Sequence, residues 1–405
     1  MIRNGLLLAS ALLVSSFAFA TPESGTARIF CEIQPKNSSS FWMMRSDVSN
    51  RYKAPEISFK DAEGAAIKIV TNPIHIQSDR MSAAIYFVGT SAVGANTLYK
   101  ANIDIAYRIG RSEALMSLAP TPSTIIDAFG VWEMPRTQVA FAHGRFALSR
   151  AAGSFEVVDA ATLKTVKSWK IDGNQVLNPE FSADGKWVKL EIFDNKNIYS
   201  TKIFSLTSEE VLSLPASGRQ TQVGLSFLGN AVAWTESNTF AASADKTLVL
   251  KTADFAELRK GKSRTILTET SKFLRALRVF QGNDGRYFTV VLKETYSSPI
   301  NSPEKSLTKG EAVIVSLGSD LSVASSEAVN FDPTFYYLGK SMALTPYGVL
   351  SNMTYSPYSN QVIFSLGHLG GLASLNLETK QWAFHAVNSL NTCYYPVVGP
   401  EVTND

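Results

Sequence analysis

The stretch Asn178-Pro179-Glu180-Phe181-Ser182-Ala183-Asp184-Gly185-Lys186-Trp187 carries the most specific fold signal in the chain. Asp184-Gly185 is a dipeptide that favours tight turns between antiparallel strands, because glycine readily adopts a positive φ. Apolar residues lie on both sides of this dipeptide: Phe181 precedes it, and the β-rich run 187–192 follows it. The stretch therefore predicts a β-hairpin.

Short apolar runs of the same kind recur along the chain, and polar turn residues separate them. Seven runs stand at comparable positions: 27–31, 84–88, 138–141, 187–192, 231–234, 287–291 and 361–364. A second run follows each of them: 41–44, 98–104, 155–159, 198–204, 248–252, 312–316 and 372–377. Successive repeats begin roughly 45 to 75 residues apart, which is typical of four-stranded propeller blades.

These repeats predict an all-β fold, a seven-bladed β-propeller that forms a single domain over residues 21–405. The first repeat lacks a first strand, whereas the run 391–398 is left over after the seventh. We therefore expect the N- and C-terminal strands to pair and close the ring. Helix is expected only as one or two turns within 271–280. The alternative folds are a β-sandwich or two smaller β domains.

The decapeptide 178–187 resembles the turn between the first and second strands of TolB-like and related WD-like propellers. Residues 282–287 are a second copy of this turn, and residues 355–361 are a degenerate third. The resemblance is strongest over 153–204 and weak before residue 120, and it is to an architecture rather than to one functional family. It implies a propeller and favours protein–protein contact in the cell envelope.

The first twenty residues have the pattern of a secretory signal peptide. Arg3 precedes an apolar or small run over 5–19, and Ala18-Phe19-Ala20 supplies the small residues that signal peptidase accepts. An N-terminal membrane anchor is the alternative, but the run is shorter than the roughly twenty residues needed to span a bilayer. We therefore expect a periplasmic or secreted protein with no transmembrane segment after cleavage.

The chain has two cysteines, Cys31 in the first repeat and Cys393 in the leftover C-terminal run. If the two ends of the chain pair, these residues come close together, and an oxidising compartment permits a disulfide between them. We predict this bridge; the alternative is two buried thiols.

Composition excludes several functional classes. The chain is 45% hydrophobic and 18% charged, with a formal net charge of +3 over 405 residues. A disordered chain has fewer apolar residues, and a nucleic-acid-binding domain is usually far more basic. We expect a globular protein that does not bind nucleic acid.

Catalytic and metal-binding patterns are absent from the sequence. The four histidines are not spaced as metal ligands, and two distant cysteines do not form a zinc knuckle. We expect no catalytic residue, no metal and no cofactor, although two carboxylates from distant repeats can still meet at a propeller channel. Asp104, Asp159 and Glu378 end comparable strands, where we expect them to accept hydrogen bonds from turn backbone.

Two surface features are candidates for binding. One is a long insertion in the sixth repeat, and the other is a basic cluster in the fifth repeat; their candidate residues are Tyr296, Ile300, Lys305, Arg259, Lys260, Lys262 and Arg264. A tolerated loop insertion and a solvated turn are the alternatives. The sequence favours a monomeric, non-catalytic module that binds a protein or a cell-envelope component. The alternative function is a propeller hydrolase or lactonase with its active site at the central channel.

Overall fold

The structure is a computed structural model, and all structural statements below refer to the residues that it describes. These are 27–33, 40–45, 56–69, 75–78, 82–90, 96–104, 108–120, 138–171, 175–193, 199–215, 221–237, 246–271, 277–296, 307–331, 334–337, 340–343, 353–365, 371–386 and 393–400. The predicted signal peptide and residues 297–306 of the predicted insertion lie outside them. No helix in these ranges is long and apolar enough to cross a membrane.

The described chain folds into antiparallel sheets, six of four strands, one of five and one of two. The first sheets along the chain are β31 (Cys393–Pro400) with β1 (Ala27–Ile33), β2 (Ser40–Arg45) and β3 (Glu56–Ile57); β4 (Lys68–Ile69) and β5 (His75–Ser78) with β6 (Ser82–Thr90), β7 (Asn96–Asp104) and β8 (Glu113–Ser117); and β9 (Val139–Ala142), β10 (Arg145–Leu148), β11 (Ser154–Asp159) and β12 (Thr165–Lys170).

The sheets that follow are β13 (Gln175–Phe181), β14 (Trp187–Phe193), β15 (Tyr199–Ser205) and β16 (Val211–Ser213); β17 (Thr221–Leu228), β18 (Ala231–Ser237), β19 (Lys246–Asp254) and β20 (Arg264–Ser271); β21 (Val279–Gln281), β22 (Tyr287–Tyr296), β23 (Leu307–Leu317) and β24 (Val323–Phe331); the hairpin β25 (Thr334–Tyr337) and β26 (Lys340–Ala343); and β27 (Met353–Ser356), β28 (Gln361–Ser365), β29 (Gly371–Asn376) and β30 (Trp382–Ala386).

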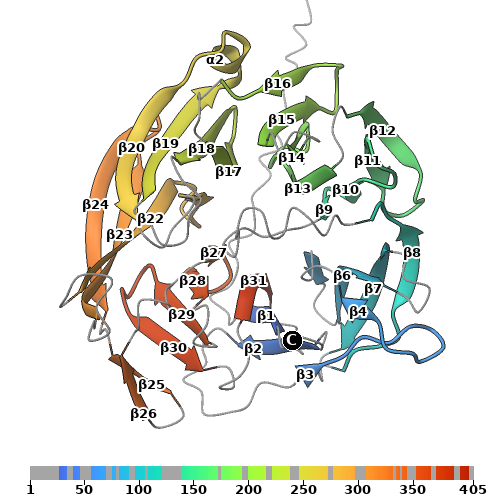
Figure 1. The fold of residues 1–405 in the computed structure, drawn as a ribbon, viewed down its shortest axis with the longest axis horizontal. Coiled ribbons are helices and arrows are strands. Elements are labelled where there is room, and N and C mark those ends of the chain that lie inside the picture. The colour runs from blue at the N-terminus through green and yellow to red at the C-terminus, as the bar shows by residue number, and fades with distance from the viewer. Residues whose placement is uncertain are drawn as a thin grey trace, which may run out of the picture.

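The sheets follow one another around a common centre in chain order (Figure 1). The first strands, such as β9, β13, β17 and β27, face this centre, and the fourth strands lie outside. Strands β9 and β13 are in contact, as are β17 and β21. The two ends of the described chain meet, because β1 pairs antiparallel with β31 from Ala27 opposite Pro400 to Ile33 opposite Cys393.

The strand pairing also places the two cysteines. Cys393 lies opposite Ile33, two residues beyond Cys31 on the same strand, and the register is irregular between Phe30 and Glu32. The cysteines therefore lie on adjacent strands but not directly opposite each other. The bridge between them stays a prediction.

Most predicted runs fall within strands of the structure, with one error of position. Residues 138–141 were grouped with runs such as 187–192, which lies in the second strand of its sheet, but Val139–Phe141 belong to β9, the first strand of its sheet. The second strand is β10, which follows a short turn at His143-Gly144. Alternation of apolar residues does not distinguish a first strand from a second, which explains the error.

The helix expected within 271–280 is not found at the described positions of that range. Within 271–280, Ser271 ends β20 and Val279 begins β21, while 272–276 lie outside the described residues. The structure has a short helix at α2 (Phe255–Arg259), where Asp254 accepts a hydrogen bond from the backbone of Glu257 and the Glu257 side chain bonds back. Such a reciprocal capping pair is readable from sequence as Asp-x-x-Glu.

The apolar core lies between neighbouring sheets. Val188 and Leu190 of β14 are fully buried together with Phe155 of β11, whereas Trp234 of β18 is fully buried against Ile203 of β15. Burying one such side chain contributes about 1.5–3 kcal/mol. Since each sheet is covered by its neighbours, its turns are held at fixed positions.

Candidate functional site

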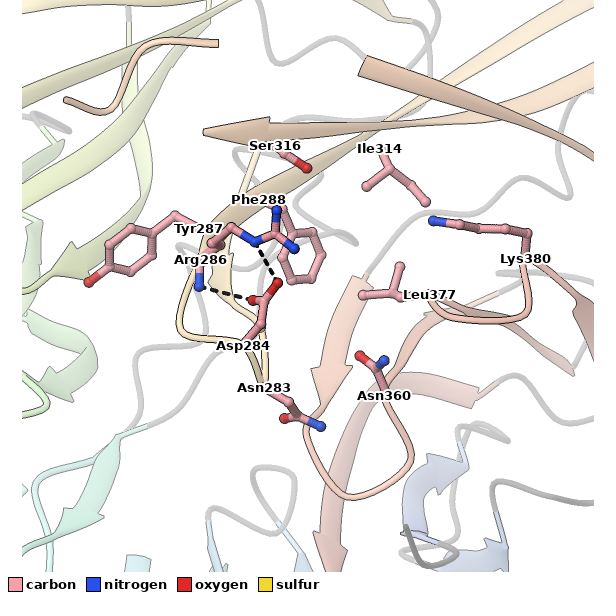
Figure 2. Close-up of a pocket in the computed structure, with 11 residues that line it drawn as sticks. Asn283, Asp284, Arg286, Tyr287, Phe288, Ile314, Ser316, Asn360, Leu377 and Lys380 are labelled. Atoms are coloured by element: carbon pink, nitrogen blue, oxygen red, sulfur yellow. Dashed lines mark hydrogen bonds and ion pairs between the residues drawn. The ribbon is translucent and has the colours of Figure 1, made fainter. Parts of the chain in front are cut away.

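A pocket of about 280 Å³ lies between the β21–β24 sheet and the β27–β30 sheet (Figure 2). Its lining comes from the turns that join neighbouring strands and from β23: Gly282, Asn283, Asp284, Arg286, Tyr287, Phe288, Ile314, Ser316, Asn360, Leu377 and Lys380. Polar and charged side chains therefore make up most of the lining residues, and Phe288, Ile314 and Leu377 add apolar surface.

The first wall of the pocket is the turn between β21 and β22. The backbone N–H of Gly282 donates to the carbonyl of Arg286 at 2.8 Å, and that of Gly285 donates to the carbonyl of Gly282 at 2.9 Å. Gly285 has a φ of +78°, which glycine adopts without strain. These bonds fix the position of Asp284 at the tip of the turn.

Asp284 is bound twice by Arg286. Its Oδ1 accepts from the Arg286 backbone N–H at 3.0 Å, and its Oδ2 accepts from Nε at 2.6 Å (Figure 2). Partial burial alone raises the pKa of the Asp284 carboxyl, but these bonds and the positive charge of Arg286 outweigh burial and hold the pKa below its usual value. Asp284 is therefore ionised at neutral pH and forms a neutral pair with Arg286.

The second wall is an amide network that joins the two sheets. Nδ2 of Asn283 donates to the carbonyl of Pro357 at 2.8 Å. The Tyr355 hydroxyl lies 3.2 Å from Oδ1 of Asn283 and 3.0 Å from Oδ1 of Asn360, and its single proton serves one of them at a time. Among the described residues, none accepts a hydrogen bond from Nδ2 of Asn360, so this donor is available to a ligand.

Lys380 borders the pocket on the side opposite Asp284. It lies in the turn between β29 and β30 with a φ of +60°, and its N–H donates to the carbonyl of Asn376 at 3.0 Å. Oδ1 of Asn376 accepts from the N–H groups of Glu378 at 2.9 Å and of Thr379 at 2.8 Å, which closes the turn. The Lys380 ammonium reaches across to Glu327 of β24, with Nζ 2.8 Å from Oε2.

The pocket thus offers two different ends. Arg286 and Asp284 neutralise each other at one end, near the amide of Asn360. At the other end lies Lys380, whose side chain extends toward Ile314, whereas Ser316 lies on the Arg286 side of Ile314 (Figure 2). Such convergent polar groups in a concave site suit a small ligand that carries hydroxyl groups and an oxygen-rich polar group.

A second polar cluster lies on the first two strands of the β13–β16 sheet. Nζ of Lys189 is 3.2 Å from Oε2 of Glu180 and 3.9 Å from Oε1 of Glu191, and Asn178 donates to Oε2 of Glu191 at 2.5 Å. Lys189 and Glu191 are almost fully buried, and the buried hydroxyl of Thr201 has no described partner. Since the carboxylates are occupied by Lys189 and Asn178, we regard this cluster as structural.

The predicted basic cluster is divided by the fold. Arg259 binds Glu210 of the preceding sheet through Nε at 2.6 Å and a second guanidinium nitrogen at 3.0 Å. Arg264 donates to the carbonyl of Asp320 in the following sheet. Both arginines therefore link neighbouring sheets, and neither lines the pocket.

The other predicted binding residues lie away from the pocket or outside the description. Lys260 and Lys262 are exposed, and no described residue bonds their side chains. Tyr296 is the last residue of β22, whereas Ile300 and Lys305 lie outside the described residues. Their role in binding stays a prediction.

The prediction for strand-end carboxylates is confirmed at one position. Asp159 accepts from the N–H of Thr162 at 2.8 Å. At Glu378 the prediction is wrong, because Asn376 is the acceptor and Glu378 supplies only its N–H. Asp104 is the last residue of β7, and its side chain is not described.

Sequence reasoning identified the turns at 282–287 and 355–361 but interpreted them as architecture only. The signal for a site was the pair of amides, Asn283 and Asn360, within those two copies of one turn. Copies of a turn in adjacent repeats lie at the same edge of neighbouring sheets. Lys380 carried no recognisable signal.

Comparisons with known proteins provide information on the fold of the chain. No protein-family profile matches the chain, and no curated protein sequence matches it. The chain is similar to the periplasmic gluconolactonase of Pseudomonas aeruginosa, at 12% identity over 92% of this chain and 99% of that one, with a TM-score of 0.50.

Two further solved structures are similar at lower TM-scores. A putative 6-phosphogluconolactonase from Bacteroides uniformis has 11% identity over 92% of this chain and 99% of that one, with a TM-score of 0.49. The WD40 domain of Toxoplasma gondii coronin has 9% identity over 84% of this chain and 73% of that one, with a TM-score of 0.39. Together with the sheets, the likeness to the gluconolactonase shows an all-β, β-propeller-like fold.

Proposed function

We propose that the chain hydrolyses a small sugar lactone in the pocket between the β21–β24 and β27–β30 sheets. The observation that carries the proposal is the convergence of a carboxylate, a guanidinium, an ammonium and two amides around about 280 Å³. The named activity of the gluconolactonase with a similar fold supports the choice of reaction. This function is the hydrolase alternative of the sequence analysis, with its site at a turn cluster rather than in the channel.

Hydrolysis of a lactone requires few protein groups. Water adds to the lactone carbonyl, the ring C–O bond breaks, the ring oxygen takes a proton, and a carboxylate and one proton are released. Lys380 supplies positive charge for the oxygen that becomes negative in the transition state. Asp284 and Asn360 bind the sugar hydroxyls or the attacking water. Because the pKa of Asp284 is lowered, it is a weak base, and positioning is its main contribution.

The test is proton release from glucono-1,5-lactone in weak buffer, corrected for spontaneous hydrolysis. We expect the full chain to accelerate it, and Asp284→Asn to lower kcat/KM by about tenfold or more. Asp320→Asn is the matched control, because Asp320 makes the same bond to an N–H two residues on, at 3.0 Å in the turn between β23 and β24, but lies outside the pocket. No acceleration, or equal loss in both variants, contradicts the proposal.

We also propose the finer architecture that the sequence predicts. The chain is exported and forms a seven-bladed, TolB-like ring, in which β31 completes the blade of β1–β3 and a Cys31–Cys393 disulfide fastens the ends. Support comes from the six four-stranded sheets and one five-stranded sheet, and from the pairing of β1 with β31. Mass spectrometry of the unreduced, folded protein tests the bridge; two free thiols contradict it.

A second candidate function is a non-catalytic module that binds a protein or a cell-envelope component. The observation that favours it is the exposure of Lys260 and Lys262 after α2, where no described side chain neutralises them. Affinity capture from the native envelope with wild-type bait and with a Lys260→Gln/Lys262→Gln bait tests this function. Loss of one specific partner with the variant supports it, and an identical capture by both contradicts a role for these lysines.

A further inference from the structure

We propose that the Lys380 end of the pocket selects a ligand with an anionic oxyacid group, a carboxylate or a phosphate, and that Glu327 competes with the ligand for Lys380. This inference rests on the proposed function, because it concerns the same pocket. It adds the charge of the ligand and its orientation, and it names Glu327 as a residue that sets specificity.

Lys380 is held in place by its backbone. The turn from β29 to β30 is closed by the bonds of Asn376 described above, and the N–H of Leu377 donates to the carbonyl of Asn360 at 3.0 Å. The turn is therefore tied to the neighbouring wall of the pocket. Only the flexible side chain of Lys380 is free to move, and Figure 2 shows it extending toward Ile314 of β23.

The partner of Lys380 is exchangeable. Glu327 lies opposite Ile314 on the outer strand β24, and its side chain is 56% exposed while that of Lys380 is 35% exposed. An exposed ion pair of this kind is weak, because water screens both charges. A bound anion that satisfies the Lys380 ammonium inside the pocket can therefore replace Glu327.

The other cation of the pocket is not exchangeable in the same way. Arg286 holds Asp284 through both its backbone N–H and its Nε within one turn. An anion near this end meets the Asp284 carboxylate, which repels it. At the Lys380 end, the carboxylate that a described contact places beside the ammonium is that of Glu327, which is exposed and exchangeable.

These charges orient the ligand. Its anionic group lies at Lys380, and its hydroxyl groups lie at Asp284 and Asn360. A neutral polyol of the same length makes only the second set of contacts. The pocket therefore discriminates by charge at one end only.

The test compares the affinities of three probes by calorimetry: gluconate, 6-phosphogluconate and the neutral polyol glucitol. We expect Glu327→Gln to tighten both anionic probes about threefold to fivefold and to leave glucitol unchanged, since an exposed ion pair is worth no more than that. Lys380→Asn should weaken the anions about tenfold. Asparagine is chosen because it tolerates a positive φ. A larger effect on 6-phosphogluconate than on gluconate identifies phosphate as the preferred group.

Lys186→Gln is the control for loss of an exposed lysine, because Lys186 pairs with Asp184 at 3.6 Å in the turn between β13 and β14, outside this pocket. Unchanged anion affinity in Glu327→Gln, an equal change for glucitol, or no binding of any probe overturns the inference. Charge-dependent binding without lactone hydrolysis keeps the inference and removes the proposed reaction. Lactone hydrolysis that falls in Asp284→Asn, together with anion affinities that do not change in Glu327→Gln, keeps the proposed reaction and removes the inference.

Discussion

The turn between β13 and β14 and the turn between β21 and β22 are two copies of one structure with different surroundings. Each has an Asp-Gly pair, and the glycines have φ values of +65° and +78°. In each turn the aspartate Oδ1 accepts from the N–H two residues on, at 3.1 Å for Asp184 and 3.0 Å for Asp284. The backbone of the turn therefore does not determine whether a pocket forms beside it.

The difference lies in the side chains around the turn. Ser182 donates to Asp184 at 2.7 Å, and the ring of His143 from the preceding sheet lies over Gly185, with Nε2 3.1 Å from the carbonyl of Ser182. The second copy has Gly282 in place of the serine, and a Cβ on Gly285 would meet nothing within 4 Å. A turn that is packed in one sheet is open in another, and the pocket lies beside the open one.

The largest expected effect comes from adding one methyl group to each glycine. In Gly185→Ala the new Cβ would lie 2.9 Å from two carbons of the His143 ring, so steric overlap adds to the strain of a positive φ. We expect a loss of about 2 to 4 kcal/mol in the free energy of unfolding. Gly285→Ala carries the strain alone and should lose about 1 to 2 kcal/mol. Urea denaturation measures both; equal losses would contradict the comparison.

The next effect is the coupling between His143 and Gly185. The three atoms nearest to the added Cβ all belong to the imidazole ring, so removing the ring removes the closest steric overlap. The loss caused by Gly185→Ala should therefore fall by about 1 to 2 kcal/mol in a His143→Ala background. A double-mutant cycle in urea measures this, and Gly285→Ala in the same background is the control that should not change. Additive losses at Gly185 would show that the ring does not fill the turn.

The sequence predicted the two turns but not their difference. Asp-Gly pairs between apolar runs identify hairpins because the signal is local, and the alternation of residues such as Val188 and Leu190 then identifies the buried strands. Whether a turn is packed or open depends on residues far away in the chain, such as His143 for Gly185. A single sequence without contacts carries no signal of that kind.

The same limit explains the basic cluster and the pocket. Arg259 was interpreted as a binding residue because its neighbours in sequence are basic, but its partner Glu210 lies 49 positions earlier. Asn283, Asn360 and Lys380 come from two sheets and meet only after folding. The all-β repeat pattern was therefore predictable, whereas the residues of the site required the structure.

A smaller expected effect concerns the stability of the fold at acid pH. Partial burial alone raises the pKa of Asp184, but bonds from Ser182 and Lys186 outweigh it, and the pKa of Asp184, like that of Asp284, is lower in the folded chain than its usual 3.8. Each ionised carboxylate thus stabilises the fold above that value, and the contribution is lost as pH falls through the lowered folded pKa.

The free energy of unfolding should decline less below pH 5 in Asp184→Asn and in Asp284→Asn than in the wild type. We expect the difference to be between a few tenths of a kcal/mol and about 1 kcal/mol for each variant. Melting curves at stepped pH measure this. Acid profiles that match the wild type in both variants would contradict it.

The smallest expected effect comes from converting the open turn toward the packed one. In Gly282→Ser the new Cβ would lie 3.0 Å from Oδ1 of Asp284, a side-chain atom that can shift. The hydroxyl can then donate to Asp284 as Ser182 does to Asp184, and serine reduces the entropy of the unfolded chain. We expect a gain of about 0.5 kcal/mol in the free energy of unfolding. The same bond occupies the carboxylate that the ligand needs, so lactone hydrolysis should fall a few-fold while stability rises. A variant that loses stability, or keeps full hydrolysis, would show that the missing side chain at position 282 is not what leaves Asp284 available.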